Sequence, residues 1–225
     1  MPVSFGVFDD VVTSVLAKIQ PESILDIGAG AGKYGVMVRD LLPSCRRIAV
    51  EIEESYIRDF ELQKLYDDIR LMSAADLITD ARNELFDVAI IGDCIEHLPK
   101  STGLDLLNFL VYRTKYIIVL APEYICQGMV EDKASEAHIS VWSEQDFTWH
   151  DAWAFDNCCT MNCILLRGYQ ATSVSLPQLV HLINAESVPV FDFHKEKIMR
   201  RALLQLHVRR RLEIINGQEA GFRCP

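Results

Sequence analysis

Short runs of apolar, β-favouring residues alternate with longer segments of helical apolar spacing along the first 120 positions. The short runs predict strands at 23–27, 47–51, 69–72, 86–91 and 116–120, and the longer segments predict helices at 7–19, 33–42, 55–65 and 102–113. Strands that alternate with helices in this way are typical of a parallel sheet covered by helices. The pattern therefore predicts an α/β fold with a doubly wound, mostly parallel sheet.

The pattern changes after Pro122. A polar stretch extends to His138, a short helix is expected at 143–147, and two β-like runs follow at 152–155 and 159–166. Because no helical segment separates these two runs, they predict an antiparallel hairpin on the edge of the sheet.

The last part of the chain differs from the rest in charge. Residues 192–213 include seven basic and three acidic residues, a net charge of +4. Ile198, Ala202, Leu203 and Leu206 fall on one helical face, so this stretch is expected to be a helix with its arginines outward. The arginines would be either a solvated face or a surface for phosphate, nucleic acid or a partner. We divide the chain into a body at 1–170 and a C-terminal helical extension at 171–225.

Composition and charge exclude some classes of protein and favour others. The 225 residues carry a formal charge of −10, and such a chain repels polyphosphate except at a local basic patch. No apolar run approaches the roughly 20 residues that span a bilayer. The first residues lack the basic segment of a secretory signal, and the seven cysteines fit reduced thiols. These features favour a cytoplasmic protein without a membrane span.

The most informative stretch is 24–35, which reads Ile-Leu-Asp-Ile-Gly-Ala-Gly-Ala-Gly-Lys-Tyr-Gly and joins a predicted strand to a predicted helix. Small residues at such a junction let the backbone turn tightly and approach a ligand. A phosphate-binding P-loop does not fit, because Ile27 stands where its first glycine is required and Tyr34 stands where it requires Ser or Thr.

Two ligand classes remain for this loop. A dinucleotide-binding turn uses Gly30, Gly32 and Gly35 with Glu51 as the ribose-binding acid, but it leaves Asp26 without a role. The pattern Asp-x-Gly-x-Gly-x-Gly, with an acid ending the second strand, resembles the class I S-adenosylmethionine-dependent methyltransferases. The resemblance covers roughly residues 20–170. The stretch at 86–98, with its Glu-His-Leu, is similar to the fourth motif of a branch that includes small-molecule O-methyltransferases.

The resemblance implies a Rossmann-like methyltransferase fold and S-adenosyl-L-methionine as cofactor. The glycines would cradle its amino acid part and ribose, and Glu51 would bind the ribose hydroxyls. Asp26 would help to orient the loop and would receive the ammonium, directly or through water. Asp76, or the backbone of Ala75, would contact the adenine. The cofactor-binding residues expected in this way are Asp26, Gly28, Gly30, Gly32, Glu51, Asp76 and Asp93.

Asp93, Glu96 and His97 follow the fourth predicted strand, at the edge where open α/β sheets bind ligands. Their spacing would put them on one face of a helical turn. In one interpretation His97 is a general base that removes a hydroxyl proton while Asp93 or Glu96 orients its imidazole. His138, which follows the fifth strand, is a further catalytic candidate.

In a second interpretation Asp93, Glu96, His97 and His138 ligate a divalent metal. Asp-x-x-Glu-His followed by a distant His is similar to the Glu-x-x-Glu-His plus His arrangement of the small-RNA 3′-terminal 2′-O-methyltransferases, with Asp93 in place of the first Glu. These donors suit Mn, Fe, Co or Zn better than Mg. In a third interpretation the Glu-His-Leu turn only lines the cofactor pocket and caps a helix.

The resemblance implies an enzyme that transfers a methyl group, and the expected acceptor is an oxygen of a small molecule or glycan. Two alternatives stay open. One is a metal-dependent RNA 2′-O-methyltransferase, whose RNA would bind the extension through Arg209, Arg210 and Arg211. The other is a module that binds the cofactor without catalysis.

Overall fold

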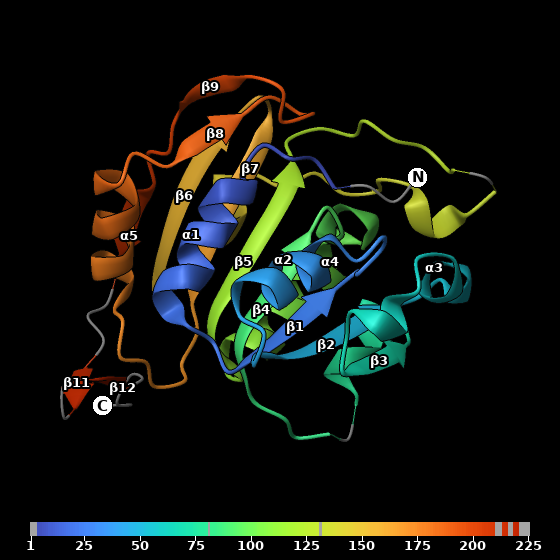
Figure 1. Ribbon diagram of the computed structural model, residues 1–225, viewed down its shortest axis with the longest axis horizontal. Coiled ribbons are helices and arrows are strands. Elements are labelled where there is room, and N and C mark those ends of the chain that lie inside the picture. The colour runs from blue at the N-terminus through green and yellow to red at the C-terminus, as the bar shows by residue number, and fades with distance from the viewer. Residues whose placement is uncertain (1–3, 81, 131, 210–212, 216–217, 221–225) are drawn as a thin grey trace.

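The computed structural model describes residues 4–80, 82–130, 132–209, 213–215 and 218–220. Within them an eight-stranded sheet has the order β10-β6-β7-β5-β4-β1-β2-β3 (Figure 1). Five strands are parallel, and their bounds are β1 Ser23–Ile27, β2 Arg46–Glu51, β3 Asp68–Leu71, β4 Phe86–Gly92 and β5 Thr114–Pro122. Three strands are antiparallel to their neighbours, namely β6 Ala152–Cys158, β7 Met161–Arg167 and β10 Gln205–Val208. The predicted α/β class and mostly parallel sheet are confirmed.

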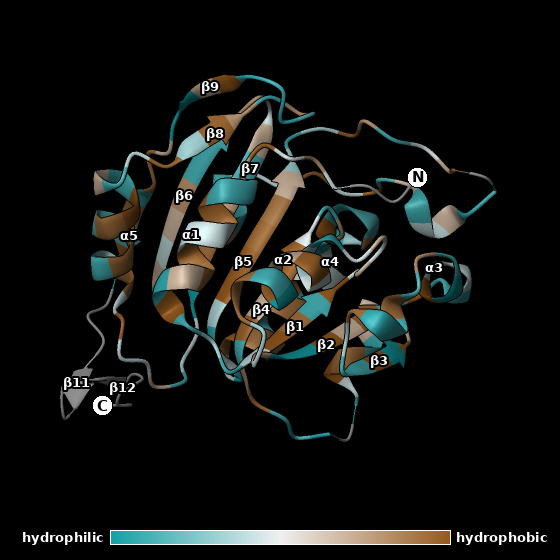
Figure 2. Cartoon of the chain, in the orientation of Figure 1, coloured by the Kyte–Doolittle hydropathy of each residue, from teal (hydrophilic) through white to brown (hydrophobic). Residues whose placement is uncertain are grey.

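Helices cover both faces of the sheet. One hydrophobic cluster joins it to α1 (Asp9–Ile19), α2 (Lys33–Leu41) and α5 (Leu176–Ala185), and a second joins it to α4 (Lys100–Val111). Along β4, Val88 and Ile90 belong to the first cluster, whereas Ala89 and Ile91 belong to the second. Both faces are therefore buried, which explains why the central strands are mostly apolar in sequence and why β5 is largely brown in Figure 2.

The predicted helix at 55–65 is wrong in its second half. The helix α3 spans only Glu54–Asp59. Glu61 then adopts a left-handed φ of 49°, and a short 3-10 turn, η1, follows at Leu62–Lys64. The break lets Leu62 and Leu65 pack in a third cluster, which includes Ala29 of the glycine loop. Here tertiary packing overrides the local helical pattern.

The hairpin of β6 and β7 is confirmed, but it does not form the edge of the sheet. β10 pairs with β6, so that Leu206 lies opposite Ala154. An open β6 edge would expose unpaired N–H and C=O groups, and β10 satisfies them.

The predicted basic helix within 192–213 is wrong, because its described part forms strands. β9 (Ile198–Arg201) pairs with β8 (Pro189–Phe191), and β10 follows. The extended chain allows Arg200 to make two hydrogen bonds to the buried carboxylate of Asp156 in β6, at 2.5 and 3.1 Å. Of the four residues expected on one helical face, Ala202 is buried, while Ile198, Leu203 and Leu206 are exposed. Arg210 and Arg211 lie outside the described residues.

The region after residue 170 shares the core of the body. Leu179 and Ile183 of α5 belong to the same cluster as Val12 and Leu16 of α1. The division at residue 170 stays a prediction. Among the described residues, no helix is both long enough and apolar enough to cross a membrane.

Candidate functional site

A pocket of about 480 Å³ opens at the carboxyl ends of β1, β2 and β4. This is the position at which open α/β sheets bind ligands, and the volume lies within the usual range for small-molecule sites. Five carboxylate side chains line it, from Glu51, Glu53, Asp93, Glu96 and Glu136, whereas none of the described lining residues is Lys or Arg. The pocket therefore favours cationic or neutral ligands over anions.

The glycine loop between β1 and α2 forms one wall. Gly28 has a φ of +75°, and an added Cβ would lie 2.5 Å from Cys94 Sγ. Gly32 has a φ of +80°, and its Cβ would lie 2.5 Å from a methyl group of Leu65. Gly28 and Gly30 line the pocket, whereas Gly32 lies outside the lining and directly precedes α2. The sequence pattern thus reflects both backbone conformation and close packing.

Asp26 lies beneath this loop and does not line the pocket. Its carboxylate is fully buried and accepts a hydrogen bond of 2.5 Å from the Tyr66 hydroxyl, which itself accepts from the backbone N–H of Gly35 at 3.0 Å. Burial raises the pKa of Asp26 to about 7, against the opposing effect of the Tyr66 hydrogen bond. Asp26 is not among the residues that line the pocket, so a contact with the cofactor's ammonium would run through water. Both of its expected roles stay predictions.

Asp26 is expected to make stability depend on pH. The folded-state pKa of Asp26 lies above the ordinary value of 3.8, so the folded state holds its proton more tightly than the unfolded state does. The contribution of this proton to the free energy of unfolding is full below about pH 4 and is lost as the pH rises through about 7. The unfolding free energy of Asp26→Asn should therefore fall less between pH 5 and pH 7 than that of the unmodified chain, by roughly 2 kcal/mol. Urea unfolding at the two pH values measures this, with Asp40→Asn on the exposed surface of α2 as control. Equal falls in all three proteins would contradict it.

Glu51 ends β2 at the pocket wall, as predicted. One carboxylate oxygen accepts from the N–H of Gly30 at 2.7 Å, and the other accepts from the N–H of Glu53 at 2.8 Å. Burial raises the pKa of Glu51 above its ordinary value, and these donors oppose the rise. Each oxygen retains a further lone pair for a ligand.

Asp76 does not line the pocket. Its carboxylate accepts from the N–H of Ser73 at 3.2 Å and so caps the 3-10 turn η2 (Ala74–Ile78). Ala75, the predicted alternative, does line the pocket, together with Met72 and Ala74. The third-strand wall is therefore mainly apolar.

Asp93 lines the pocket, but the expectation that it shares a helical face with Glu96 and His97 is wrong. Asp93 has a left-handed φ of 49°, and the 3-10 turn η3 (Ile95–His97) begins two residues later. Its Oδ2 accepts from the N–H of Phe5 at 3.0 Å, while its buried Oδ1 has no partner among the described residues. Burial raises the pKa of Asp93 to about 7, although the nearby Lys33 lowers it.

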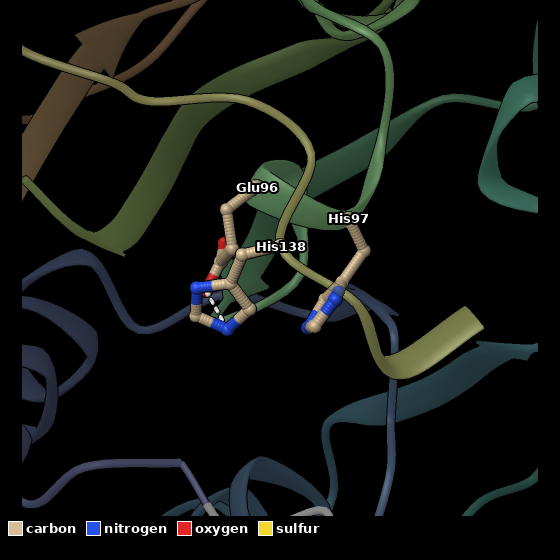
Figure 3. A group of neighbouring side chains, drawn as sticks. All are labelled: Glu96, His97 and His138. Atoms are coloured by element: carbon tan, nitrogen blue, oxygen red, sulfur yellow. Dashed lines mark ion pairs between the residues drawn. The ribbon is translucent and has the colours of Figure 1, made fainter. Parts of the chain in front are cut away.

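Glu96, His97 and His138 meet at the other end of the pocket (Figure 3). They offer ligand atoms that all lie within 4.8 Å of one another. Among the described residues this cluster does not include Asp93, so the predicted set of four ligands is reduced to three. Asp93 precedes η3 and has a left-handed backbone, so its carboxylate does not share a helical face with Glu96 and His97.

The electrostatics of this cluster are set by burial. Burial and the negative charge of Asp93 raise the pKa of Glu96 well above its usual range. Burial, and secondarily the neighbouring His97, lowers the pKa of His138 to about 4, so its ring is neutral at pH 7. Nδ1 of His97 lies 3.1 Å from the carbonyl oxygen of Ala137. Because a carbonyl only accepts, Nδ1 carries the hydrogen, and Nε2 of the neutral ring keeps its lone pair.

The sequence pattern did not reveal one wall, which lies between α3 and the segment after β5. The Tyr56 hydroxyl donates to Glu136 at 2.9 Å, Lys133 donates to Ser55 at 3.2 Å, and Ser135 donates to Glu53. These partners are about 80 residues apart, and no motif marks them. The one available signal was topological, since the segment follows the carboxyl end of a central strand.

The sequence matches no protein-family model, and no curated protein is similar enough to match it. One similar solved structure is that of the plantazolicin methyltransferase BpumL in complex with a monoazolic desmethylPZN analog and SAH. It has 16% sequence identity and a TM-score of 0.55, and the match covers 72% of this chain and 83% of that one. A SAM-dependent methyltransferase from Archaeoglobus fulgidus has 15% identity and a TM-score of 0.53, over 70% of this chain and 93% of that one. The SAH-bound N-terminal domain of EvdMO1 has 10% identity and a TM-score of 0.54, over 73% and 82%. The fold is that of the S-adenosylmethionine-dependent methyltransferases.

Proposed function

We propose that this chain is a methyltransferase that uses S-adenosylmethionine to methylate an oxygen of a small molecule or glycan. The observation that carries the proposal is the position of Glu51, which ends β2, borders the pocket and is joined to the glycine loop by the N–H of Gly30. A carboxylate held in this way is suited to two adjacent ribose hydroxyls, because it accepts hydrogen bonds without donating any.

The described pocket fits the rest of the cofactor. The apolar wall at Met72, Ala74 and Ala75 suits the adenine, and the backbone at Gly28 and Gly30 suits the amino acid part. The unpartnered Oδ1 of Asp93 is available to an ammonium group. When bound, the cofactor supplies an electrophilic methyl group on a sulfonium, and a pocket lined by carboxylates favours that positive charge.

The acceptor would lie at the end formed by Glu96, His97 and His138. There its oxygen would form a bond to the methyl carbon as the carbon–sulfur bond breaks, and its proton would pass to Nε2 of His97 or to water. Holding the two reactants in line and excluding water supplies much of the rate, because the sulfonium is already a good leaving group.

The charges favour a neutral acceptor over RNA. No Lys or Arg stands among the described lining residues, so a phosphate backbone would meet carboxylates without a cationic side chain to balance them. In the extension, Arg200 is engaged with Asp156, and Arg209 donates to the carbonyl oxygen of Thr148. A metal-dependent RNA methyltransferase and a non-catalytic cofactor-binding module remain the alternatives.

Calorimetry with S-adenosylhomocysteine, followed by incubation with labelled S-adenosylmethionine and pools of acceptors, tests the proposal. We expect S-adenosylhomocysteine to bind in the micromolar range, NAD not to bind, and label to appear on a neutral hydroxyl compound identified by product mass. Binding of NAD instead would overturn the cofactor assignment. Binding without label transfer to any hydroxyl, amine or RNA pool would favour the non-catalytic module.

A further inference from the structure

We infer that Glu96, His97 and His138 form a binding site for a divalent transition-metal ion, such as Zn²⁺, Mn²⁺, Fe²⁺ or Co²⁺. The three side chains project into the same space from two segments about 40 residues apart (Figure 3). Nε2 of His138 lies 4.0 Å from a carboxylate oxygen of Glu96, and the rings of His97 and His138 meet edge to face with centroids 4.8 Å apart. Ligands of one zinc ion lie about 3.3 Å apart at bond lengths of about 2.0 Å, so the cluster would close by small side-chain rotations.

Glu96 provides an observation that is independent of the histidines. Its side chain is only 1% exposed, yet neither carboxylate oxygen has a hydrogen-bond partner among the described residues. The described lining of the pocket offers no Lys or Arg to neutralise it. An ionised carboxylate in such surroundings is unfavourable, so the group either stays protonated or binds a cation that displaces its proton. A metal ion is a cation that Glu96 can bind together with the imidazoles of His97 and His138.

The backbone holds the two segments in fixed register. The carbonyl of Glu96 accepts from the N–H of Ile139 at 2.9 Å and from the N–H of Ser140 at 3.0 Å. In the opposite direction, Nδ1 of His97 donates to the carbonyl of Ala137 at 3.1 Å. Metal-bound histidines commonly donate their second N–H to such an acceptor, which fixes the ring and its tautomer. With Nδ1 engaged in this way, Nε2 is the ring nitrogen of His97 left for a metal.

The donor set narrows the choice of metal. Two imidazole nitrogens and one carboxylate oxygen suit the later first-row divalent ions, whereas Mg²⁺ prefers an all-oxygen shell. All three residues line the pocket, so an ion bound by them would have coordination positions open to a ligand. This is the arrangement of a reactive site, because structural zinc sites are closed by four protein ligands.

The consequence for the acceptor rests on the proposed function. An ion at this site would bind an oxygen of the acceptor and lower the pKa of its hydroxyl, so that the proton can pass to water without a protein base. Acceptors with two neighbouring oxygens would then be preferred over isolated alcohols, since they can occupy two open positions.

Metal binding is tested directly on the full chain, stripped with a chelator and titrated with Co²⁺. We expect one ion per chain, a Kd below about 10 µM, and visible absorption bands of nitrogen- and oxygen-bound cobalt. Glu96→Gln and His138→Ala should each weaken binding at least 10-fold or so. His181→Ala, in which an exposed histidine of α5 is removed, is the matched control and should bind as the unmodified chain does.

Affinity for S-adenosylhomocysteine is measured for each variant in parallel and shows whether the pocket is folded. No Co²⁺ or Zn²⁺ binding in a chain that binds S-adenosylhomocysteine would overturn the metal site and leave the proposed function standing. Metal binding that Glu96→Gln and His138→Ala both retain would overturn the assignment to these residues. Metal binding lost only in these variants, in a chain with no affinity for S-adenosylhomocysteine, would support the metal site and overturn the proposed function.

Discussion

Replacing His97 with alanine is expected to lower the rate of methyl transfer about 100-fold or more. The lone pair on Nε2 faces the pocket because Nδ1 is engaged with the carbonyl of Ala137. That lone pair is needed whether it takes the acceptor's proton or binds a metal ion, so both routes lose it in the variant. Affinity for S-adenosylhomocysteine should change by no more than about 3-fold, because the glycine loop and Glu51 stay in place. Steady-state kinetics and calorimetry on the same preparation measure the two quantities.

His181→Ala again serves as control for the loss of a histidine, since the His181 side chain is exposed on α5. If His97→Ala retains more than about a tenth of the rate, the imidazole only lines the pocket, as in the third interpretation. Restoration of the rate by added imidazole in His97→Ala would show that the missing group acts chemically and that the fold is intact.

Replacing Glu51 with glutamine is expected to weaken the binding of S-adenosylhomocysteine about 100-fold. The carboxylate of Glu51 accepts from two backbone N–H groups, one on the glycine loop and one on Glu53, and offers its remaining lone pairs to the ligand. Glutamine keeps the shape of the side chain but turns an NH₂ group toward one of these donors. The variant therefore loses acceptors for the ribose and also disturbs the contact that positions Gly30.

Calorimetry on Glu51→Gln beside Glu54→Gln, an exposed glutamate in the first turn of α3, measures the effect. Glu54→Gln should bind as the unmodified chain does. An affinity of Glu51→Gln within about 3-fold of that value would contradict the assignment of this carboxylate to the ribose and with it the main support for the proposed cofactor.

The central strands were predictable because both of their faces are buried. Residues 24–27 and 88–91 are apolar at nearly every position, since alternate side chains enter one or the other hydrophobic cluster. The stretch at 198–206 misled the prediction because its apolar residues fit helical spacing by chance. Its conformation is decided by contacts that are distant in sequence, the open edge of β6 and the carboxylate of Asp156.

The site residues likewise fall into those that local sequence features predict and those that depend on distant contacts. Glu51 and the glycines could be placed from sequence because the strand and the turn that carry them are local features, and His97 and His138 because they follow neighbouring parallel strands. Asp93 was misplaced with respect to Glu96 since its left-handed backbone has no signature in a non-glycine residue. The contact between Tyr56 and Glu136 joins α3 to the segment after β5, which only the folded sheet brings together, so no periodicity could reveal it.

The pairing of β10 with β6 has a consequence for synthesis of the chain. The strands β6 and β7 emerge from a ribosome well before residues 205–208, which complete the edge in the described structure. During that interval the outer edge of β6 carries unpaired N–H and C=O groups, the kind of surface at which strands of different chains associate. The newly made chain is therefore open to aggregation through β6 from the time this strand forms until β10 is available to cover it.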